Sequence, residues 1–343
     1  MQLDHLRKRM PSRYVLAVED LKTHFFTEQG VIRAVDGLDL VVSPSETLGV
    51  VGESGCGKSV TALSILRLIP SPPGRIVGGR ILFDERNLLE LSEKEIRKIR
   101  GKEISMIFQD PMTCLNPTFT IGEQVSEIIR IHESLSRQDS IVKVIDLLRK
   151  VRLPSAESRI KDYPHQMSGG MRQRVMIAIA LACNPKLMIA DEPTTALDVT
   201  IQAQILDLIQ ELKEQIKMAI ILISHNLGLL AEYAERVAVM YLGKIVESAA
   251  VNLLFDNPLH PYTCGLINSI PSIQTTRERL NVIPGLVPDL MNVPSGCRFF
   301  ERCSFASKEC SVREPNLIEV EKGHLVRCWK YCEYKESMSQ VKS

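Results

Sequence analysis

Residues 52–59 form a glycine-rich motif and read Gly52-Glu53-Ser54-Gly55-Cys56-Gly57-Lys58-Ser59. The motif follows an apolar run, Thr47 to Val51, and precedes a segment typical of a helix, Val60 to Leu66. A strand, a glycine turn and a helix in this order are the context that a G-x-x-x-x-G-K-S phosphate-binding loop requires. Its glycines let successive backbone N–H groups point into one concavity at the start of the helix. We therefore expect a bound nucleoside triphosphate, with Lys58 on its β- and γ-phosphates and the Ser59 hydroxyl on Mg²⁺.

The composition is that of an ordinary globular protein. The chain has 343 residues, of which 45% are hydrophobic and 24% charged, and its net charge is +1. This near-neutral balance argues against a nucleic-acid partner and against a polybasic membrane anchor. No apolar run approaches the ~18 residues that span a bilayer, and residues 1–11 lack the apolar region of a signal peptide. We expect a cytoplasmic chain, so any membrane part of its assembly is another polypeptide.

The pattern of apolar residues predicts an α/β protein. Segments with the character of strands are residues 15–20, 34–42, 81–83, 187–190 and 219–223. The last two are wholly apolar, as in buried parallel strands, and a helix-like segment at 200–217 separates them. Residues 122–153 have helical periodicity and predict a helical insertion, whereas the Pro/Gly-rich residues 70–79 predict a turn. Strands that alternate with helices favour a mostly parallel sheet.

Two further stretches carry groups that suit phosphate chemistry. The apolar strand at 187–190 ends in Asp191 and Glu192, where Asp191 is expected to hold Mg²⁺ and Glu192 to polarise a water for attack on the γ-phosphate. Ser168-Gly169-Gly170 precedes a long helix and offers a second anion-binding helix N-terminus. One nucleotide does not need two such ends from one subunit, and such a turn taken alone is more often a plain helix cap.

Taken together, the motifs resemble those of an ABC ATPase. They appear in that family's order and spacing: the phosphate loop, Ile107-Phe108-Gln109-Asp110-Pro111, Ser168-Gly169-Gly170, Ile189-Ala190-Asp191-Glu192, Ala196-Leu197-Asp198 and Ser224-His225. The resemblance implies a P-loop fold with a RecA-like, mostly parallel sheet, an antiparallel β part and a helical subdomain at about residues 111–170. It also implies two ATPase subunits that sandwich two ATP molecules head to tail, which explains the second anion site.

The resemblance assigns roles to single residues. Gln109 would sense Mg²⁺ and the attacking water, His225 would contact the γ-phosphate, and Asp198 would face the partner subunit. Phe25 would stack on adenine, with Phe26 a close competitor. The expected catalytic residues are Lys58, Gln109, Glu192 and His225, and the Mg²⁺ ligands are Ser59, Gln109 and Asp191. The expected nucleotide contacts are Phe25, Gly52, Glu53, Ser54, Gly55, Cys56, Gly57, Lys58, Ser59, Val60, Gln109, Ser168, Gly169, Gly170, Asp191, Glu192, Asp198 and His225.

Longer motifs look like the dipeptide/oligopeptide permease branch of this family. They are the runs 108–117, 163–174 and 257–263, and the tail motifs Ile283-Pro284-Gly285-Leu286-Val287-Pro288, Gly296-Cys297-Arg298-Phe299 and Arg302-Cys303. The resemblance implies a nucleotide-binding domain at residues 12–256 and a C-terminal extension at 257–335. Departures are Cys114, Met167 and Asn226, of which only Asn226, in place of an aspartate, is expected to alter turnover. An active ATPase is expected.

The implied assembly is a binding-protein-dependent importer of small peptides. Its partners would be a second and typically different ATPase chain, two transmembrane permease subunits and an extracytoplasmic solute-binding protein. The chain would then sit peripherally on the cytoplasmic face of the cell membrane. Some relatives import nickel, glutathione or other small solutes, so the solute stays open. A soluble ABC ATPase acting on ribosomes or DNA is the rival, and a redox or metal-sensing module is a third hypothesis.

Five of the nine cysteines crowd into the last fifth of the chain: Cys297, Cys303, Cys310, Cys328 and Cys332. Their spacing fits neither the paired C-x₂₋₄-C pattern of structural zinc sites nor the bacterial ferredoxin run. Spacing alone leaves a metal site and unrelated thiols about equally favoured. The resemblance implies a [4Fe–4S] cluster on Cys297, Cys303, Cys310 and Cys328, with Cys332 as an alternative ligand. Thiolates also suit zinc, which stays open.

Overall fold

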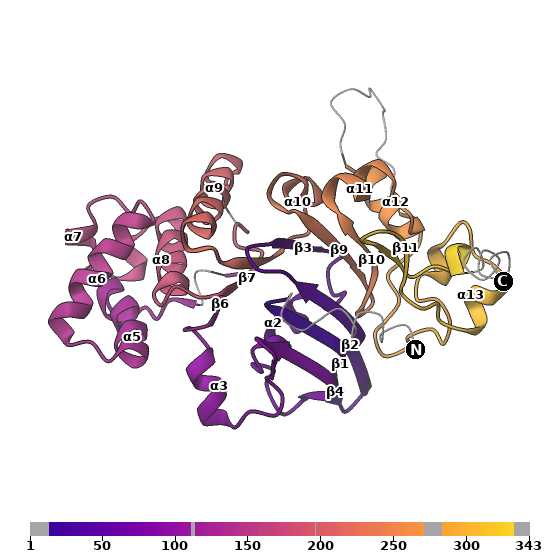
Figure 1. The fold of residues 1–343 in the computed structure, drawn as a ribbon, viewed down its shortest axis with the longest axis horizontal. Coiled ribbons are helices and arrows are strands. Elements are labelled where there is room, and N and C mark those ends of the chain that lie inside the picture. The colour runs from indigo at the N-terminus through magenta and orange to yellow at the C-terminus, as the bar shows by residue number, and fades with distance from the viewer. Residues whose placement is uncertain (1–13, 111–113, 196, 271–282, 333–343) are drawn as a thin grey trace. The chain divides into compact units, whose positions relative to one another are not determined.

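The structure is a computed structural model that describes residues 14–110, 114–195, 197–270 and 283–332. The chain divides into two compact units, which are coloured by residue number in Figure 1. The first unit draws on residues 1–41, 47–89 and 224–343, and the second on residues 42–46 and 90–223. The predicted extension thus shares a unit with the N-terminal strands. Its limit at residue 335 and the predicted domain start at residue 12 lie outside the described residues.

A four-stranded sheet, ordered β2-β1-β4-β5, forms part of the first unit. Its strands are β1 (Leu16–Thr27), β2 (Gly30–Val42), β4 (Gly74–Phe83) and β5 (Arg86–Asn87). Buried residues alternate with more exposed ones along β1, as in a sheet that packs one face on a core. The strands predicted from residues 15–20, 34–42 and 81–83 are confirmed.

The predicted turn at residues 70–79 is wrong in its second half, because β4 already begins at Gly74. The pairing of β4 with β1 shifts register between Glu19 and Lys22, opposite Gly78 and Arg80. Gly79 lies at this irregularity with φ +96, and a Cβ there would come within 2.6 Å of Asp20 O. Gly78 and Gly79 therefore lie within β4 at a bulge in its pairing with β1, not in a turn.

A second set of strands in the first unit runs in the order β11-β12-β10-β9-β3. Its members are β3 (Thr47–Val51), β9 (Arg236–Tyr241), β10 (Lys244–Ala250), β11 (Ile318–Glu321) and β12 (His324–Val326). β3 pairs parallel with β9, and the other pairs are antiparallel. The extension thus adds its hairpin, β11 and β12, to the edge of β10 (Figure 1).

The helices within the described residues of the first unit are short. They are α2 (Lys58–Ile65), α10 (Leu227–Tyr233), α11 (Val251–Asp256), α12 (Pro261–Asn268) and α13 (Lys308–Val312), with the 3₁₀ turn η3 (Phe300–Arg302). The described residues of the extension therefore contain both helix and strand.

Buried Glu247 on β10 holds the start of the extension. Its Oε1 accepts the Leu259 N–H at 2.7 Å, its Oε2 accepts the His260 N–H at 2.8 Å, and His324 Nε2 lies 2.7 Å from Oε1. His260 caps α12, because its Nδ1 accepts the Tyr262 N–H at 3.1 Å. Burial lowers the pKa of His260 to about 4.

We expect the free energy of unfolding to fall as the pH is lowered from about 6.5 to about 4. In this range His260 stays neutral in the native state but binds a proton in the unfolded state, which costs up to about 3 kcal/mol of stability. His260→Asn keeps a capping acceptor and does not titrate. Urea unfolding of both chains at several pH values measures the effect, and equal pH dependence of the two would contradict it.

The second unit contains three parallel strands, ordered β8-β7-β6. They are β6 (Ile104–Ile107), β7 (Leu187–Asp191) and β8 (Ala219–Ile223), and every residue of β7 and β8 is buried. This confirms both predicted parallel strands. The apolar sequence follows from burial on both faces.

Helices make up most of the second unit. They are α3 (Glu93–Ile99), α5 (Ile121–Glu133), α6 (Arg137–Lys150), α7 (Ala156–Arg159), α8 (Gly169–Leu181) and α9 (Val199–Ile216), with the 3₁₀ turn η2 (Pro164–Gln166). Capping boxes of Ser92 with Glu95 and of Thr120 with Glu123 begin α3 and α5. Figure 1 shows α5, α6 and α8 gathered in magenta beside β6 and β7, which confirms the predicted helical insertion.

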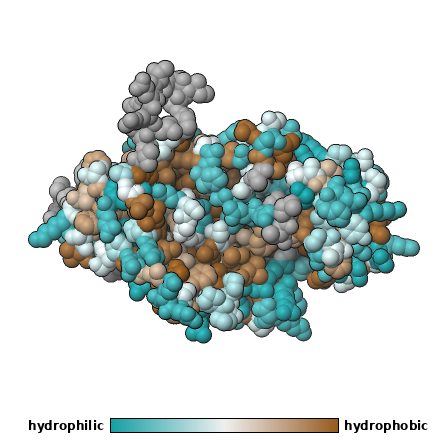
Figure 2. Space-filling model, turned by 180° about the vertical axis from the view of Figure 1, so that it is seen from behind, coloured by the Kyte–Doolittle hydropathy of each residue, from teal (hydrophilic) through white to brown (hydrophobic). Residues whose placement is uncertain are grey.

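Within the described parts of the chain, none of the helices combines the length and hydropathy needed to cross a membrane. On the face drawn in Figure 2, hydrophobic residues reach the surface in patches among hydrophilic ones. The most exposed large apolar side chains are Leu286 and Val199, at 91% and 82%. Single exposed apolar side chains are normal on protein surfaces, so neither marks a site by itself.

Candidate nucleotide-binding site

The phosphate loop connects β3 to α2 in the first unit. Gly57 caps α2 with φ 106, in the left-handed region, and the helix begins at Lys58. A Cβ on Gly57 would come within 2.3 Å of Ala34 O, and a Cβ on Gly52 within 2.2 Å of Met240 O. Both positions therefore require glycine for steric reasons. The loop is also held from outside, because Gly243 N–H donates to Cys56 O at 2.8 Å.

Lys58 folds back onto the loop. Its Nζ donates to Gly52 O at 2.7 Å and to Glu53 O at 3.2 Å, and the residue is buried. The positive charge is thus held against carbonyl oxygens of the same loop whose N–H groups the motif offers to phosphate. Ser59 follows directly on the first turn of α2. The sequence motif and the strand–loop–helix context agree.

The second unit carries the carboxylates at the end of β7. Asp191 is buried, and Glu192 lies just beyond it with φ 47 and donates its N–H to Ile223 O at 3.0 Å. Glu192 Oε2 accepts hydrogen bonds from Gln109 Nε2 at 3.3 Å and from Thr195 Oγ1 at 3.1 Å. The structure therefore brings Gln109 and Glu192 together, and their roles in hydrolysis stay predictions. Thr195 was not predicted, since no motif marks a threonine three residues after the acid.

Ser168 and Asp198 both begin helices of the second unit. Ser168 Oγ accepts the Met171 N–H at 3.3 Å at the start of α8, with Gly169 and Gly170 as its first residues. Asp198 Oδ1 accepts the Ile201 N–H at 2.9 Å at the start of α9. Ser168 and Asp198 are both exposed. The helix cap expected at Ser168 is confirmed, whereas the cap at Asp198 was not predicted. The role of Ser168 toward a partner's nucleotide and that of Asp198 toward the partner subunit stay predictions.

His225 and Phe25 lie in the first unit. His225 is exposed and follows Ser224, whose N–H donates to Val50 O at 3.1 Å. Asn226 caps α10, because its Oδ1 accepts the Gly228 N–H at 2.9 Å. Phe25 is half-buried opposite Gly74, whereas Phe26 is half-exposed. The adenine contact stays a prediction, and so does the effect of Asn226 on turnover.

Met167 and Cys114 are the two other departures from the family pattern. The Met167 side chain is buried, and Cys114 is exposed. Parts of two predicted motifs, residues 111–113 and Ala196, lie outside the described residues.

The cysteines of the extension share one region of the first unit. Cys297 N–H donates to Cys310 O at 2.7 Å. Burial, together with the smaller effect of neighbouring thiols, raises the pKa of Cys297 to about 11 and that of Cys328 to about 12. The thiols of Cys297, Cys303 and Cys310 all contribute to the raised pKa of Cys328. Cys332 packs, like Cys328, against a small apolar cluster of Leu259, Ile318 and Val326.

Over residues 14–110, 114–195, 197–270 and 283–332, no group of three or more His, Cys, Asp or Glu side chains is arranged to hold a metal ion. Electrostatic effects reach much farther than a metal–thiolate bond of about 2.3 Å. The thiols of Cys297, Cys303, Cys310 and Cys328 are therefore close enough to influence one another electrostatically. They are not arranged as the ligands of one metal ion.

Comparison with known proteins decides the family. A family model described as "ABC transporter" matches residues 35–195, and one described as "Oligopeptide/dipeptide transporter, C-terminal region" matches residues 246–310. The chain is 54% identical over 317 residues to the probable peptide ABC transporter ATP-binding protein y4tR of Sinorhizobium fredii, with 92% of this chain and 95% of the relative covered. The chain belongs to the peptide ABC transporter ATP-binding proteins. It is also 51% identical to the oligopeptide transport ATP-binding protein AppD of Bacillus subtilis, over 92% of this chain and 97% of the relative.

Solved structures agree with this family. The ATP-binding cassette MJ0796, in a dimeric post-hydrolysis state bound to ADP and Pi, matches with a TM-score of 0.62 and 25% identity over 69% of this chain and 98% of that one. The structure of cbiO1 from Clostridium perfringens, part of the ABC transporter complex cbiONQ, matches with a TM-score of 0.60 and 27% identity over 71% of this chain and 92% of that one. The predicted fold and family are confirmed, and the chain is an ABC-type ATPase.

Proposed function

We propose that this member of the family hydrolyses ATP to drive the import of dipeptides or oligopeptides across the cytoplasmic membrane. The observation that carries the proposal is the contact between Gln109 and Glu192 at the end of β7. It places an amide donor on the carboxylate that would polarise the attacking water. Peptide import is supported by relatives whose names state peptide or oligopeptide transport, at about half identity and near-complete coverage.

In this proposal the phosphate loop binds the nucleotide, and the residues at the end of β7 carry out the hydrolysis. The loop at residues 52–59 holds the β- and γ-phosphates through backbone N–H groups and Lys58. Glu192 takes the proton of the attacking water, and Gln109 orients that carboxylate. Ser59 and Asp191 offer the hydroxyl and carboxylate oxygens that Mg²⁺ prefers. When bound, Mg²⁺ neutralises charge that develops on the phosphate oxygens.

The proposed assembly contains further chains. A second ATPase subunit would supply the Ser168-type helix end to each nucleotide, and two transmembrane permease subunits would carry the solute. An extracytoplasmic binding protein would deliver it. The chain would then lie peripherally on the cytoplasmic face of the membrane. An importer of nickel, glutathione or another small solute is the alternative within this role.

Purification of the tagged full chain from detergent-solubilised membranes tests the transport assignment. We expect two integral membrane subunits and a second ATPase to co-purify in comparable amounts. Tagged Lys58→Met chain serves as a control, because assembly on the membrane subunits does not depend on hydrolysis. Recovery from the soluble fraction together with ribosomes or DNA would instead favour the soluble ABC ATPase.

We also propose that Cys297, Cys303, Cys310 and Cys328 hold a [4Fe–4S] cluster, with Cys332 as the alternative fourth ligand. Four neighbouring thiols are the donor set that such a cluster uses. A bound cluster would cross-link the extension and stabilise its fold. Zinc is the alternative metal for the same thiols.

Replacing Cys303 and Cys310 by Ser tests this site. We expect the full chain, purified without oxygen, to contain iron and sulfide and to absorb visible light. The double variant should lose the iron, the sulfide and the absorption. The matched control is Cys183→Ser, a half-buried thiol of the second unit, which should keep the iron. Zinc in place of iron would support the alternative, and an absence of both metals would refute a metal site. Loss of a redox response with stability unchanged would favour a sensing role.

A further inference from the structure

Two residues of the C-terminal extension contact one residue of the phosphate loop. Arg302 Nη1 lies 2.7 Å from Glu53 Oε2, and Arg302 Nη2 lies 3.0 Å from Glu53 Oε1. The guanidinium thus binds the carboxylate through two parallel hydrogen bonds, the geometry with the highest strength and specificity for this pair. The Arg302 side chain is only 4% exposed and the Glu53 side chain 28%. Shielding from water strengthens the electrostatic attraction between these two charges relative to that of an exposed ion pair.

The same loop residue is held through its backbone. Glu53 N–H donates to the hydroxyl of Tyr262 at 2.9 Å, and Tyr262 is fully buried at the start of α12. Side chain and main chain of Glu53 are therefore both fixed by the extension. Lys58 Nζ contacts the carbonyl of this residue, at 3.2 Å. A shift of Glu53 would therefore be transmitted to the lysine that binds phosphate.

Arg302 is also held in place by contacts with residues outside the phosphate loop. Its Nε donates to Pro284 O at 3.0 Å, and its Nη1 lies 3.4 Å from the Tyr241 hydroxyl. Its guanidinium carbon lies 5.8 Å and 5.9 Å from the ring centroids of Tyr241 and Phe299. These rings and Tyr262 form one aromatic cluster, with centroids 4.7–5.5 Å apart. These contacts already orient the guanidinium group of Arg302. Pairing with Glu53 therefore costs little additional side-chain entropy.

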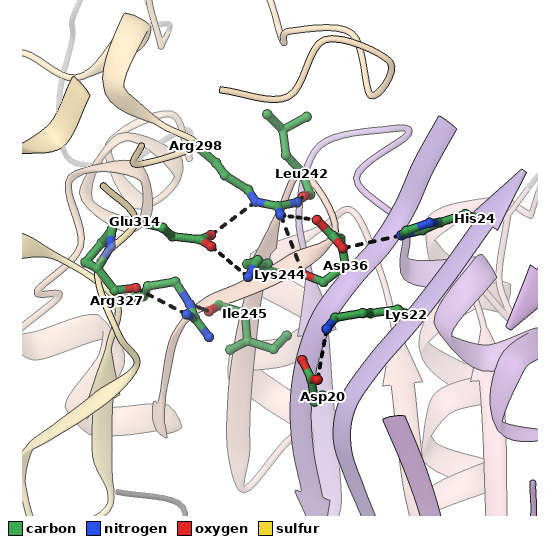
Figure 3. Close-up of polar contacts among 11 residues, drawn as sticks. Asp20, Lys22, His24, Asp36, Leu242, Lys244, Ile245, Arg298, Glu314 and Arg327 are labelled. Carbon is green, nitrogen blue, oxygen red and sulfur yellow. Dashed lines mark hydrogen bonds and ion pairs between the residues drawn. The ribbon is translucent and has the colours of Figure 1, made fainter. Parts of the chain in front are cut away.

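A second buried arginine of the extension offers a contrast. Arg298 pairs with Asp36 on β2 at 2.7 Å and with Glu314 at 3.2 Å, and Glu314 also pairs with Lys244 (Figure 3). The Arg298 side chain is 6% exposed, so both arginines are buried to the same degree. Arg298 joins the extension to β2 and to the turn at Leu242, and among the described residues its hydrogen bonds go to Asp36, Leu242 and Glu314 rather than to residues 52–59. Replacing Arg298 therefore shows how the loss of an anchor that does not contact the phosphate loop affects the chain.

We propose that Arg302 is a positioning residue for ATP binding, through which the C-terminal extension fixes Glu53 and hence the phosphate loop. The proposal rests on the proposed binding of ATP to this loop. An unpaired carboxylate inside the loop would repel the triphosphate, and Arg302 neutralises it. Tyr262 supports the same loop residue through its backbone. A chain with a displaced extension would bind ATP more weakly even though every residue of the glycine-rich motif is present.

The affinity of the full chain for ATP and the split between KM and kcat test the proposal. For Arg302→Met we expect about tenfold weaker ATP binding and a KM raised by a similar factor, with kcat within about twofold. Arg298→Met should lower the melting temperature but leave ATP affinity within about twofold. Equal effects of the two variants on affinity, or unchanged affinity in Arg302→Met, would overturn the proposal.

Three more variants separate positioning from loss of fold. Tyr262→Phe deletes one hydroxyl and should weaken ATP binding about threefold without unfolding the chain. Arg302→Lys keeps the charge but not the fork, so its affinity should lie between those of the parent and Arg302→Met. Adding Glu53→Gln to Arg302→Met should restore part of the affinity, because the unpaired acid is removed. Additive losses in this double variant would refute the proposal.

Lys58→Met distinguishes failure of this inference from failure of the proposed function. If the parent chain binds ATP no better than Lys58→Met, nucleotide binding by the loop is itself refuted. If the parent binds ATP and Lys58→Met does not, the Arg302 series tests the extension alone.

Discussion

Replacing Glu192 by Gln should lower the rate of ATP hydrolysis about 100- to 10,000-fold, the range that a positioned general base contributes. The substitution keeps the size of the side chain and removes its ability to accept a proton. Glu192 Oε2 accepts hydrogen bonds from Gln109 and Thr195, and an amide oxygen can accept both in the same geometry. ATP binding should therefore persist in this variant. The loss should appear in kcat, since the interaction acts in the transition state.

Steady-state phosphate release and equilibrium binding of ATP measure the two effects separately. The matched control is Glu211→Gln, the same change at a half-exposed acid of α9 that pairs with Arg152 on the surface. It should leave both quantities unchanged. Hydrolysis by Glu192→Gln at the parental rate would show that another group is the base.

Replacing Lys58 by Met should weaken ATP binding by about 100-fold or more, because charge-assisted hydrogen bonds to phosphate each contribute about 1.5–3 kcal/mol. Methionine keeps the apolar stem in its buried position and removes the ammonium group. The hydrogen bonds of Nζ to Gly52 O and Glu53 O are lost as well, so the loop also loses an internal tie. Binding and hydrolysis should fall together, in contrast to Glu192→Gln.

Calorimetric titration with ATP in the presence of Mg²⁺ provides the measurement for Lys58→Met. Lys22→Met is a suitable control, because Lys22 on β1 pairs with Asp20 at the surface of the same unit. It should bind ATP as the parent does. An affinity of Lys58→Met within about threefold of the parent would contradict the assignment of the loop.

Local sequence patterns predicted the parts of the fold and site that depend on neighbours in the chain. The glycines of the phosphate loop are required where backbone atoms of Ala34 and Met240 approach, and the motif marks those positions directly. The buried parallel strands at β7 and β8 follow from their unbroken apolar runs. Ser168 was readable as a helix cap for the same reason, since its partner Met171 is three residues away.

The parts that were missed depend on contacts between distant residues. Arg302 and Glu53 are separated by 249 positions, and no periodicity or spacing relates them. The glycines of β4 looked like a turn, because a bulge becomes visible only against the paired strand β1. The cysteine spacing gave no ligand set, because it is the fold of the extension that brings Cys297 to Cys310. Long-range pairing of this kind is set by tertiary structure and leaves little trace in local sequence.

Uptake of a labelled dipeptide, a labelled pentapeptide and nickel is the most direct test of the central claim, that this chain powers a peptide importer. The comparison needs cells with the chain, without it, and with Glu192→Gln in its place. We expect uptake of at least one of the peptides to be lost in both the deletion and the variant, while nickel uptake is unchanged. Loss of nickel uptake alone would assign the importer to the metal. Unchanged uptake of all three solutes would contradict the peptide-import account.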